Sequence, residues 1–226
     1  MAVKFTYFPL FAKGPAVAVA LQKSGLEWEG AFPEDWKAMK ASTPWRELPI
    51  MEVPGVGIIG HELAMLNYIA SKVPKMAGES EKDFLVSQQL MHEAEDIYKS
   101  LGTKQDTFMA KDKVSQEVYD KFWGEPDVTT HNREFGIVLY LGLLEEFYAK
   151  CAVGGGKFTS NGSTVGECKL WAILHTLKMI KDDVLAIFPG VLAFYSRFTS
   201  EPETQAILTD GGKFPSAFKQ YFVAKE

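Results

Sequence analysis

The hydrophobic and polar positions change their period near residue 75. Before that point, four short segments rich in β-branched and aromatic residues predict strands, over 3–8, 26–32, 49–53 and 56–59. Apolar residues at helical spacing predict helices over 15–25 and 62–73. The helix between the first two strands makes these a parallel pair, and the Pro54-Gly55 turn makes the last two a hairpin.

The first predicted helix has clear ends. Pro15 suits the first helical turn, and Gly25 suits the position just past the last one. Its residues are apolar on nearly every side, which predicts that the helix is well buried.

After residue 75 the strand signals fade and helical periodicity dominates. Amphipathic or apolar helices are predicted over 81–101, 133–151, 163–180 and 191–200, with a short one over 113–123 inside the polar, turn-rich stretch 102–132. The predicted fold class is therefore α/β plus all-α, with a small mixed domain over 1–75 and an all-helical domain over 76–226.

Composition narrows the function classes. The net charge is −5 over 226 residues, which argues against nucleic acid, because phosphate binding needs a basic face. The apolar stretches are too short for a membrane span, and the N-terminus lacks the features of a signal peptide. Cys151 and Cys168 form no CxxC pair, so we expect neither a disulfide framework nor a zinc site, and a reduced cytoplasmic protein.

Four stretches carry a resemblance to a known family: "TYF" after the first strand, "GLEWE", "DWKAMKASTPWRELPIMEV" and "STVGECKLW". With this order of elements they resemble the cytosolic glutathione transferase superfamily, in its tyrosine-type and especially sigma-like form. The resemblance implies a thioredoxin-like domain before a helical domain, glutathione as co-substrate, no metal, and detoxification. In "STVGECKLW", Thr164 and Glu167 predict a capping box, with Glu167 where the family has aspartate.

Leu48 and Pro49 are the first site residues that the resemblance implies. Pro49 would be cis, and the main chain of Leu48 would pair with the cysteinyl part of glutathione like an added strand. The alternative is an ordinary trans proline on an edge strand.

Tyr7 would supply the chemistry by donating its hydroxyl to the glutathione sulfur. A thiol with a pKa of roughly 8.5 is only a few per cent ionised at pH 7. Trp36 and Lys40 match the positions that hold the glycyl end, where Lys40 would pair with the terminal carboxylate. The alternatives are a packed strand tyrosine and a solvated amphipathic turn.

The pair His61-Glu62 departs from the Gln-Ser that the family has at the start of the second helix. There the helix N-terminus and the serine bind the ligand α-carboxylate. A carboxylate at Glu62 would repel it by roughly 4 kcal/mol at 4 Å and an effective dielectric near 20. A protonated His61 could compensate, or Glu62 could turn aside and take the ligand ammonium; glutamate in a first helical turn also simply suits the helix dipole.

The loop after the first strand departs from the family as well, because Phe11 stands where an arginine is expected. We expect an apolar substrate pocket formed by Leu10, Phe11, Met91 and Tyr98, although such residues are also typical of a core. Trp45 matches the site where relatives insert an aromatic side chain into the partner of a homodimer, or it packs within its own loop.

Two function hypotheses follow. The first is a glutathione transferase-type enzyme that activates the thiol with Tyr7 and conjugates or isomerises a small hydrophobic electrophile. The second is a non-catalytic ligand-binding or structural protein on the same fold, with glutathione binding weakened by Glu62. A related enzyme using a modified thiol is a third possibility. Other signals are set aside: His92, Glu93 and Asp96 lack the spacing of a zinc motif, and His175 is interpreted as a core histidine.

Overall fold

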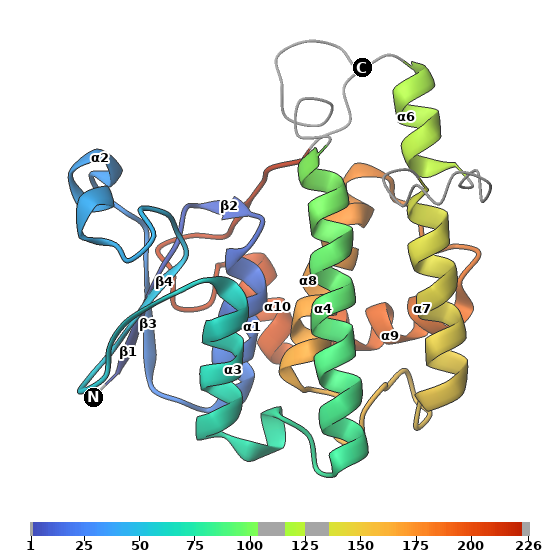
Figure 1. Cartoon of the computed structure of the whole chain (residues 1–226), viewed down its shortest axis with the longest axis horizontal. Helices are drawn as coiled ribbons and strands as arrows, with labels where there is room; N and C mark the ends of the chain where they lie inside the picture. The colour runs from blue at the N-terminus through green and yellow to red at the C-terminus, as the bar shows by residue number, and fades with distance from the viewer. Residues whose placement is uncertain (1, 104–115, 125–135, 223–226) are drawn as a thin grey trace.

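The structure is a computed structural model that describes residues 2–103, 116–124 and 136–222. Figure 1 shows a sheet at one side of the molecule and a group of long helices at the other. The sheet has the strand order β3-β1-β4-β5, formed by β1 (Val3–Thr6), β3 (Trp28–Ala31), β4 (Ile50–Val53) and β5 (Gly57–Gly60). The predicted parallel pair β1–β3 and the predicted hairpin β4–β5 are both confirmed.

Helices α1 (Gly14–Ser24) and α3 (Glu62–Lys72) lie between this sheet and the helical part of the chain (Figure 1). Residues 14–21 of α1 are all buried, as its apolar circumference predicts. Pro15 lies in its first turn, and Gly25 ends it in the left-handed conformation with φ 76°. The predicted helix ends are therefore confirmed.

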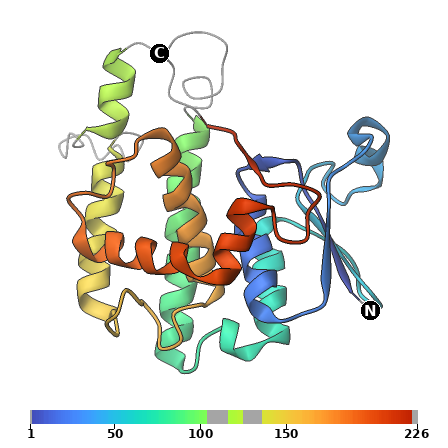
Figure 2. The ribbon, with the colours of Figure 1, turned by 180° about the vertical axis from the view of Figure 1, so that it is seen from behind.

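The remaining helices form the second part of the molecule, which Figure 2 shows from behind. They are α4 (Glu81–Thr103), α6 (Gln116–Trp123), α7 (Ile137–Cys151), α8 (Val165–Ile180), α9 (Pro189–Ser200) and α10 (Pro202–Thr209). The short segments α2 (Trp36–Met39), η1 (Lys40–Ser42) and η2 (Pro74–Met76) occur in the first 76 residues. A mixed sheet followed by helices confirms the predicted fold class. The division into domains at residue 75 stays a prediction.

Helix α8 runs through the centre of the helical part. The capping box at its start is confirmed, because Thr164 and Glu167 bond to each other's backbone amides. Trp171 in its middle is fully buried. Beside it, His175 bonds through Nδ1 to the Tyr195 hydroxyl at 2.8 Å, and burial together with Lys178 lowers its pKa to about 4. His175 is thus a neutral core histidine at pH 7.

The sequence pattern did not predict three short elements, β2, β6 and α10. Strand β2 (Leu10–Phe11) pairs in parallel with β6 (Lys219–Gln220), near the end of the described chain. Two residues are too few to display a period, so no pattern could predict either strand. Helix α10, which begins at Pro202, also went unpredicted.

Within the described residues, Cys151 and Cys168 are free and buried, and no helix is long and apolar enough to cross a membrane. The same residues contain no group of three His, Cys, Asp or Glu side chains arranged to hold a metal ion. The stretch 102–132, whose role the sequence left open, lies largely outside the described residues.

Candidate functional site

A cavity lies where the start of α3 approaches the strand that follows Pro49. The Leu48–Pro49 peptide bond is cis, so the predicted isomer is confirmed. The cavity has a volume of about 240 Å³. Its lining comes from the β2–α1 loop, the approach to β4, the start of α3 and the middle of α4: Lys13, Glu47, Leu48, Pro49, His61, Glu62, Leu63 and Glu95.

Tyr7 follows β1 and is held by the next loop. Its hydroxyl oxygen accepts a hydrogen bond from the backbone amide of Lys13 at 3.0 Å, and Lys13 also lines the cavity. Burial raises the pKa of the phenol above its ordinary 10.0, the Lys13 amide opposes this shift, and Glu62 and Tyr221 add to it. At neutral pH the phenol therefore keeps its proton. Since its oxygen already accepts a bond, that proton is available for a ligand acceptor.

Gly14 fixes where the Tyr7 ring can lie. A Cβ atom built on Gly14 would stand 2.2 Å from Cδ1 and 2.7 Å from Cγ of that ring. Only a residue without a side chain allows α1 to begin this close to Tyr7.

We expect Gly14→Ala to displace the Tyr7 ring and to cost about 1–3 kcal/mol of stability through overpacking. Any reaction that uses the Tyr7 hydroxyl should slow with it. Urea unfolding and a rate assay on the variant measure both effects. Gly142→Ala is the matched control, because a Cβ at Gly142 meets no atom within 4 Å. Equal behaviour of the two variants would contradict this role of Gly14.

Glu62 does not turn toward the N-terminal amides of its own helix. Its Oε2 forms an ion pair with Lys169 Nζ of α8 at 2.5 Å, and both side chains are almost fully buried. Lys169 Nζ also lies 3.0 Å from Glu95 Oε2, and Lys13 Nζ donates to Glu95 Oε1 at 2.8 Å. Two lysines and two glutamates thus form one network, called the charge network below, which joins α3 to α4 and α8.

In the charge network, burial and the partner charges shift each pKa in opposite directions. Burial would lower the pKa of the Lys169 ammonium, but Glu62 and Glu95 raise it above the ordinary value. Burial raises the pKa of the Glu62 carboxyl, against the opposing ammonium groups of Lys169 and Lys13. For Glu95 the two lysines outweigh burial, and its pKa is lowered. A protonated His61 was one possible partner for the charge of Glu62; in the structure Lys169 pairs with Glu62.

His61 instead lies outside this network. It precedes α3 with φ 63°, its side chain is 58% exposed, and its Nδ1 is 3.3 Å from Glu47 Oε1. The Trp45 ring stacks on it, with the ring centroids 5.3 Å apart. Trp45 is 61% exposed, so it packs on His61 at the start of α3 and also presents a face to solvent.

The residues predicted to hold the glycyl end, Trp36 and Lys40, lie apart from the cavity. Trp36 begins α2 and packs edge-on against Phe8 with 5.5 Å between ring centroids, while Lys40 is exposed one turn later. Neither residue lines the cavity beside Pro49.

The four residues of the expected apolar pocket also separate. Phe11 lies in the core, where its ring is 4.8 Å from that of His175, and Met91 is buried as well. Leu10 is half-buried in β2. Tyr98 faces the site, because the Lys13 ammonium lies 4.8 Å above its ring.

Sequence reasoning missed Glu95 and Lys169, the two distal members of the charge network. A signal was present for Lys169. It lies four residues after Val165 and four before Ile173, on a stripe of α8 in which both of those residues are buried. A lysine on such a stripe needs a buried partner.

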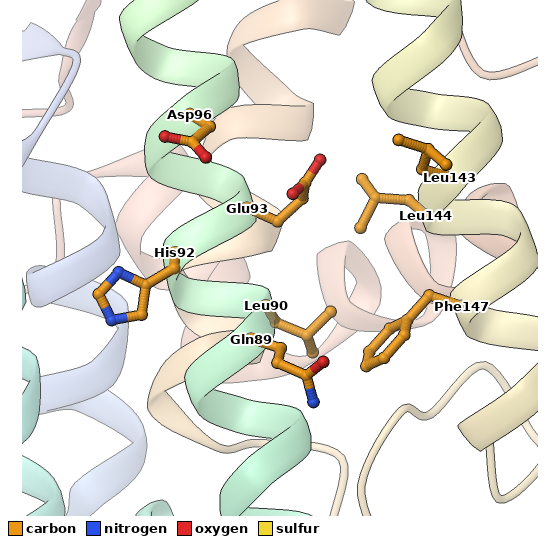
Figure 3. A pocket seen from close by; sticks show the side chains of 8 residues that line it. All are labelled: Gln89, Leu90, His92, Glu93, Asp96, Leu143, Leu144 and Phe147. Atoms are coloured by element: carbon orange, nitrogen blue, oxygen red, sulfur yellow. The ribbon is translucent and has the colours of Figure 1, made fainter.

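A second cavity, of about 340 Å³, lies between α4 and α7. Figure 3 shows Glu93 directed toward Leu144 across it, whereas the His92 ring points away. His92 and Glu93 are therefore not directed to a common point. Its lining residues are Gln89, Leu90, His92, Glu93, Asp96, Leu143, Leu144 and Phe147.

Known proteins similar to this chain are named as glutathione S-transferases and, in one case below, as a prostaglandin synthase. Glutathione S-transferase 1 of Ascaris suum is 27% identical over 179 residues, which are 76% of this chain and 75% of that protein. No family model matches the chain.

Solved structures agree in fold. The glutathione S-transferase of Ascaris lumbricoides superposes with a TM-score of 0.74 at 20% identity, covering 91% of this chain and 95% of that one. The Pi-class glutathione S-transferase of Onchocerca volvulus gives 0.71 at 17%, with 91% of each chain covered. Prostaglandin synthase D of Nilaparvata lugens gives 0.68 at 20%, covering 91% and 96%.

Proposed function

We propose, from the premise that this chain belongs to the cytosolic glutathione transferase superfamily, that it activates the thiol of glutathione and transfers it to a small hydrophobic electrophile. The observation that carries the proposal is the Tyr7 hydroxyl, which accepts from the Lys13 amide and keeps its own proton to donate. A bound thiol would place its sulfur at that proton.

The stabilisation of the thiolate that Tyr7 must provide is within the range of one hydrogen bond. Lowering a thiol pKa by two units requires about 2.7 kcal/mol of preferential binding to the thiolate. A hydrogen bond to an ionised acceptor in a partly dry site supplies energy of that order. The thiolate then forms a bond to the electrophilic carbon, which in a substitution releases its leaving group with the bonding pair. Where the product is an isomer, the thiolate leaves again.

The remaining ligand contacts follow from the cavity. The main chain of Leu48, beside cis-Pro49, would pair with the cysteinyl residue. Lys40 and Trp36 would take the glycyl end from outside the cavity. The charge network answers part of the objection raised by Glu62, since one oxygen of its carboxylate, Oε2, is paired with Lys169.

The proposal includes a cytoplasmic homodimer. In support of a second copy, large apolar side chains are exposed on the hairpin side and along α4 and α7: Trp45, Ile58, Phe84, Leu85 and Leu143. Contiguous apolar surface marks a contact site, and the proposal is that a second copy of the chain covers these side chains. The mass of the protein in solution measures this part directly.

The decisive experiment is a calorimetric titration with glutathione at pH 7, together with conjugation to an activated aryl chloride. We expect saturable binding and a rate above that of glutathione alone. Lys40→Met should weaken binding about two- to fivefold through the lost carboxylate contact. Lys37→Met, which removes a lysine of the adjoining helix α2, is the matched control and should change nothing.

The opposite result points to the second hypothesis. If the unmodified protein neither binds glutathione nor accelerates conjugation, the transferase proposal is wrong. A non-catalytic ligand-binding or structural protein on this fold would then be the better description.

A further inference from the structure

The cavity beside Pro49 has an acidic wall. Glu47, Glu62 and Glu95 line it, and Lys13 is the lysine among its lining residues. Together with Lys169, which pairs with Glu62 from behind, these five groups carry a formal charge of −1. A ligand that enters therefore meets a net negative field.

Glu62 has unused hydrogen-bonding capacity inside this wall. Its Oε2 is taken by Lys169, but its buried Oε1 has no hydrogen-bond partner among the described residues. The side chain is only 2% exposed. A carboxylate oxygen that is buried without a donor is costly, and a ligand that supplies a donor recovers that cost.

The lysines, in contrast, are already engaged. Lys13 Nζ donates to Glu95 at 2.8 Å and lies 4.8 Å above the Tyr98 ring. Lys169 Nζ lies between Glu62 and Glu95, and its side chain is 3% exposed. An incoming carboxylate would have to draw one of these ammonium groups away from a buried glutamate, which would leave that glutamate unpaired.

We propose that this cavity recognises its thiol ligand by an ammonium group bound at Glu62 Oε1, and that it disfavours a free carboxylate on the same end of the ligand. Glu62 is then the residue that determines specificity. The ligand class is a cysteinyl peptide whose amino-terminal acyl group ends in an amine. This inference rests on the proposed function, because it concerns the far end of the same thiol.

Two analogues of glutathione separate the charges at that end. 4-Aminobutanoyl-Cys-Gly keeps the ammonium and lacks the α-carboxylate, whereas glutaryl-Cys-Gly keeps the carboxylate and lacks the ammonium. Calorimetric titration of the unmodified protein at pH 7 and fixed salt should give the order aminobutanoyl, glutathione, glutaryl, from tightest to weakest. We expect the two analogues to differ by at least about tenfold in Kd.

Glu62→Gln tests the assigned residue, since glutamine keeps the size and removes the charge. It should reduce the ratio of the two analogue Kd values to within about twofold of unity. Glu47→Gln is the matched control: this carboxylate lines the same cavity but is 56% exposed, and its removal should leave most of the ratio.

The outcomes distinguish the two proposals. Equal or tighter binding of the glutaryl analogue overturns the inference while the proposed function stands. A ratio that survives Glu62→Gln overturns the assignment to Glu62. If none of the three thiols binds, the proposed function fails and this inference fails with it. The comparison on the unmodified protein needs no variant, so a poorly folding Glu62→Gln leaves the charge preference itself tested.

Discussion

Replacing Lys169 by methionine is expected to lower the free energy of unfolding by about 3–5 kcal/mol at pH 7, because two buried glutamates lose their shared cation. Glu62 loses its 2.5 Å partner outright, while Glu95 keeps Lys13 at 2.8 Å. Urea unfolding of the variant measures the loss. Methionine roughly preserves the length of the side chain, so cavity formation contributes little.

The loss should depend on pH in a defined direction. Without Lys169, burial holds the pKa of the Glu62 carboxyl in the folded protein above its unfolded value, near 4.5. A group whose pKa is raised on folding contributes stability below its unfolded pKa and loses it as the pH rises through the folded value. Lys169→Met should therefore be less destabilising at pH 5 than at pH 8.

Two further variants isolate the charge effect. Lys150→Met removes a lysine whose ion pair with Glu146 spans 3.6 Å between side chains that are 74% and 66% exposed, and it should change stability by less than about 0.5 kcal/mol. Adding Glu62→Gln to Lys169→Met should restore part of the lost stability, because the uncompensated charge is gone. Equal stability of the two lysine variants would refute a structural role for the charge network.

Tyr7→Phe is expected to slow conjugation of glutathione by about 25-fold at pH 7, because the thiolate fraction falls by that factor when the pKa of the bound thiol rises from roughly 6.5 to roughly 8.5. The effect should shrink as the pH approaches the ordinary thiol pKa of roughly 8.5, where the sulfur ionises without help. Conjugation rates measured from pH 6 to 9 test this. Phenylalanine preserves the ring that packs on Gly14, so the fold should be retained.

Tyr195→Phe provides the comparison for Tyr7. It also removes a phenol oxygen that has a hydrogen-bond partner, His175 at 2.8 Å. This hydrogen bond joins α9 to α8 and lies away from the cavity beside Pro49. Any stability lost with a single hydrogen bond, about 1 kcal/mol, should be similar in the two variants, while the conjugation rate falls only for Tyr7→Phe. An unchanged rate in Tyr7→Phe would remove Tyr7 from the mechanism.

The sequence predicts the local features of this fold well, because each depends on neighbouring residues. Pro15 and Gly25 mark the ends of α1, and Thr164 with Glu167 mark the start of α8, through interactions that span a few positions. The cis bond before Pro49 depended on the resemblance to the family, since a lone Leu-Pro pair does not specify its isomer.

The charge network could not be predicted in the same way. Glu62 and Lys169 are 107 residues apart, and periodicity reveals that Lys169 faces the interior without revealing what it meets there. The same limit applies to Phe11. Its position in an apolar loop suggested a substrate pocket, whereas its contact with His175 on α8 makes it part of the core. Contacts between residues far apart in the sequence can be identified only once the three-dimensional structure is known.

The pairing of β2 with β6 has a consequence for the protein while it is being made. Leu10 and Phe11 follow Tyr7 closely, yet their strand partner is residues 219–220, and Lys219 donates to the Pro9 carbonyl at 3.0 Å. At translation rates of roughly 5–20 residues per second, the partner is synthesised about 10–40 s after Tyr7. On the ribosome, β2 must therefore wait until roughly 200 further residues have been synthesised before its strand partner exists. We expect a nascent chain stalled before residue 219 to hold a folded sheet beside an incomplete site.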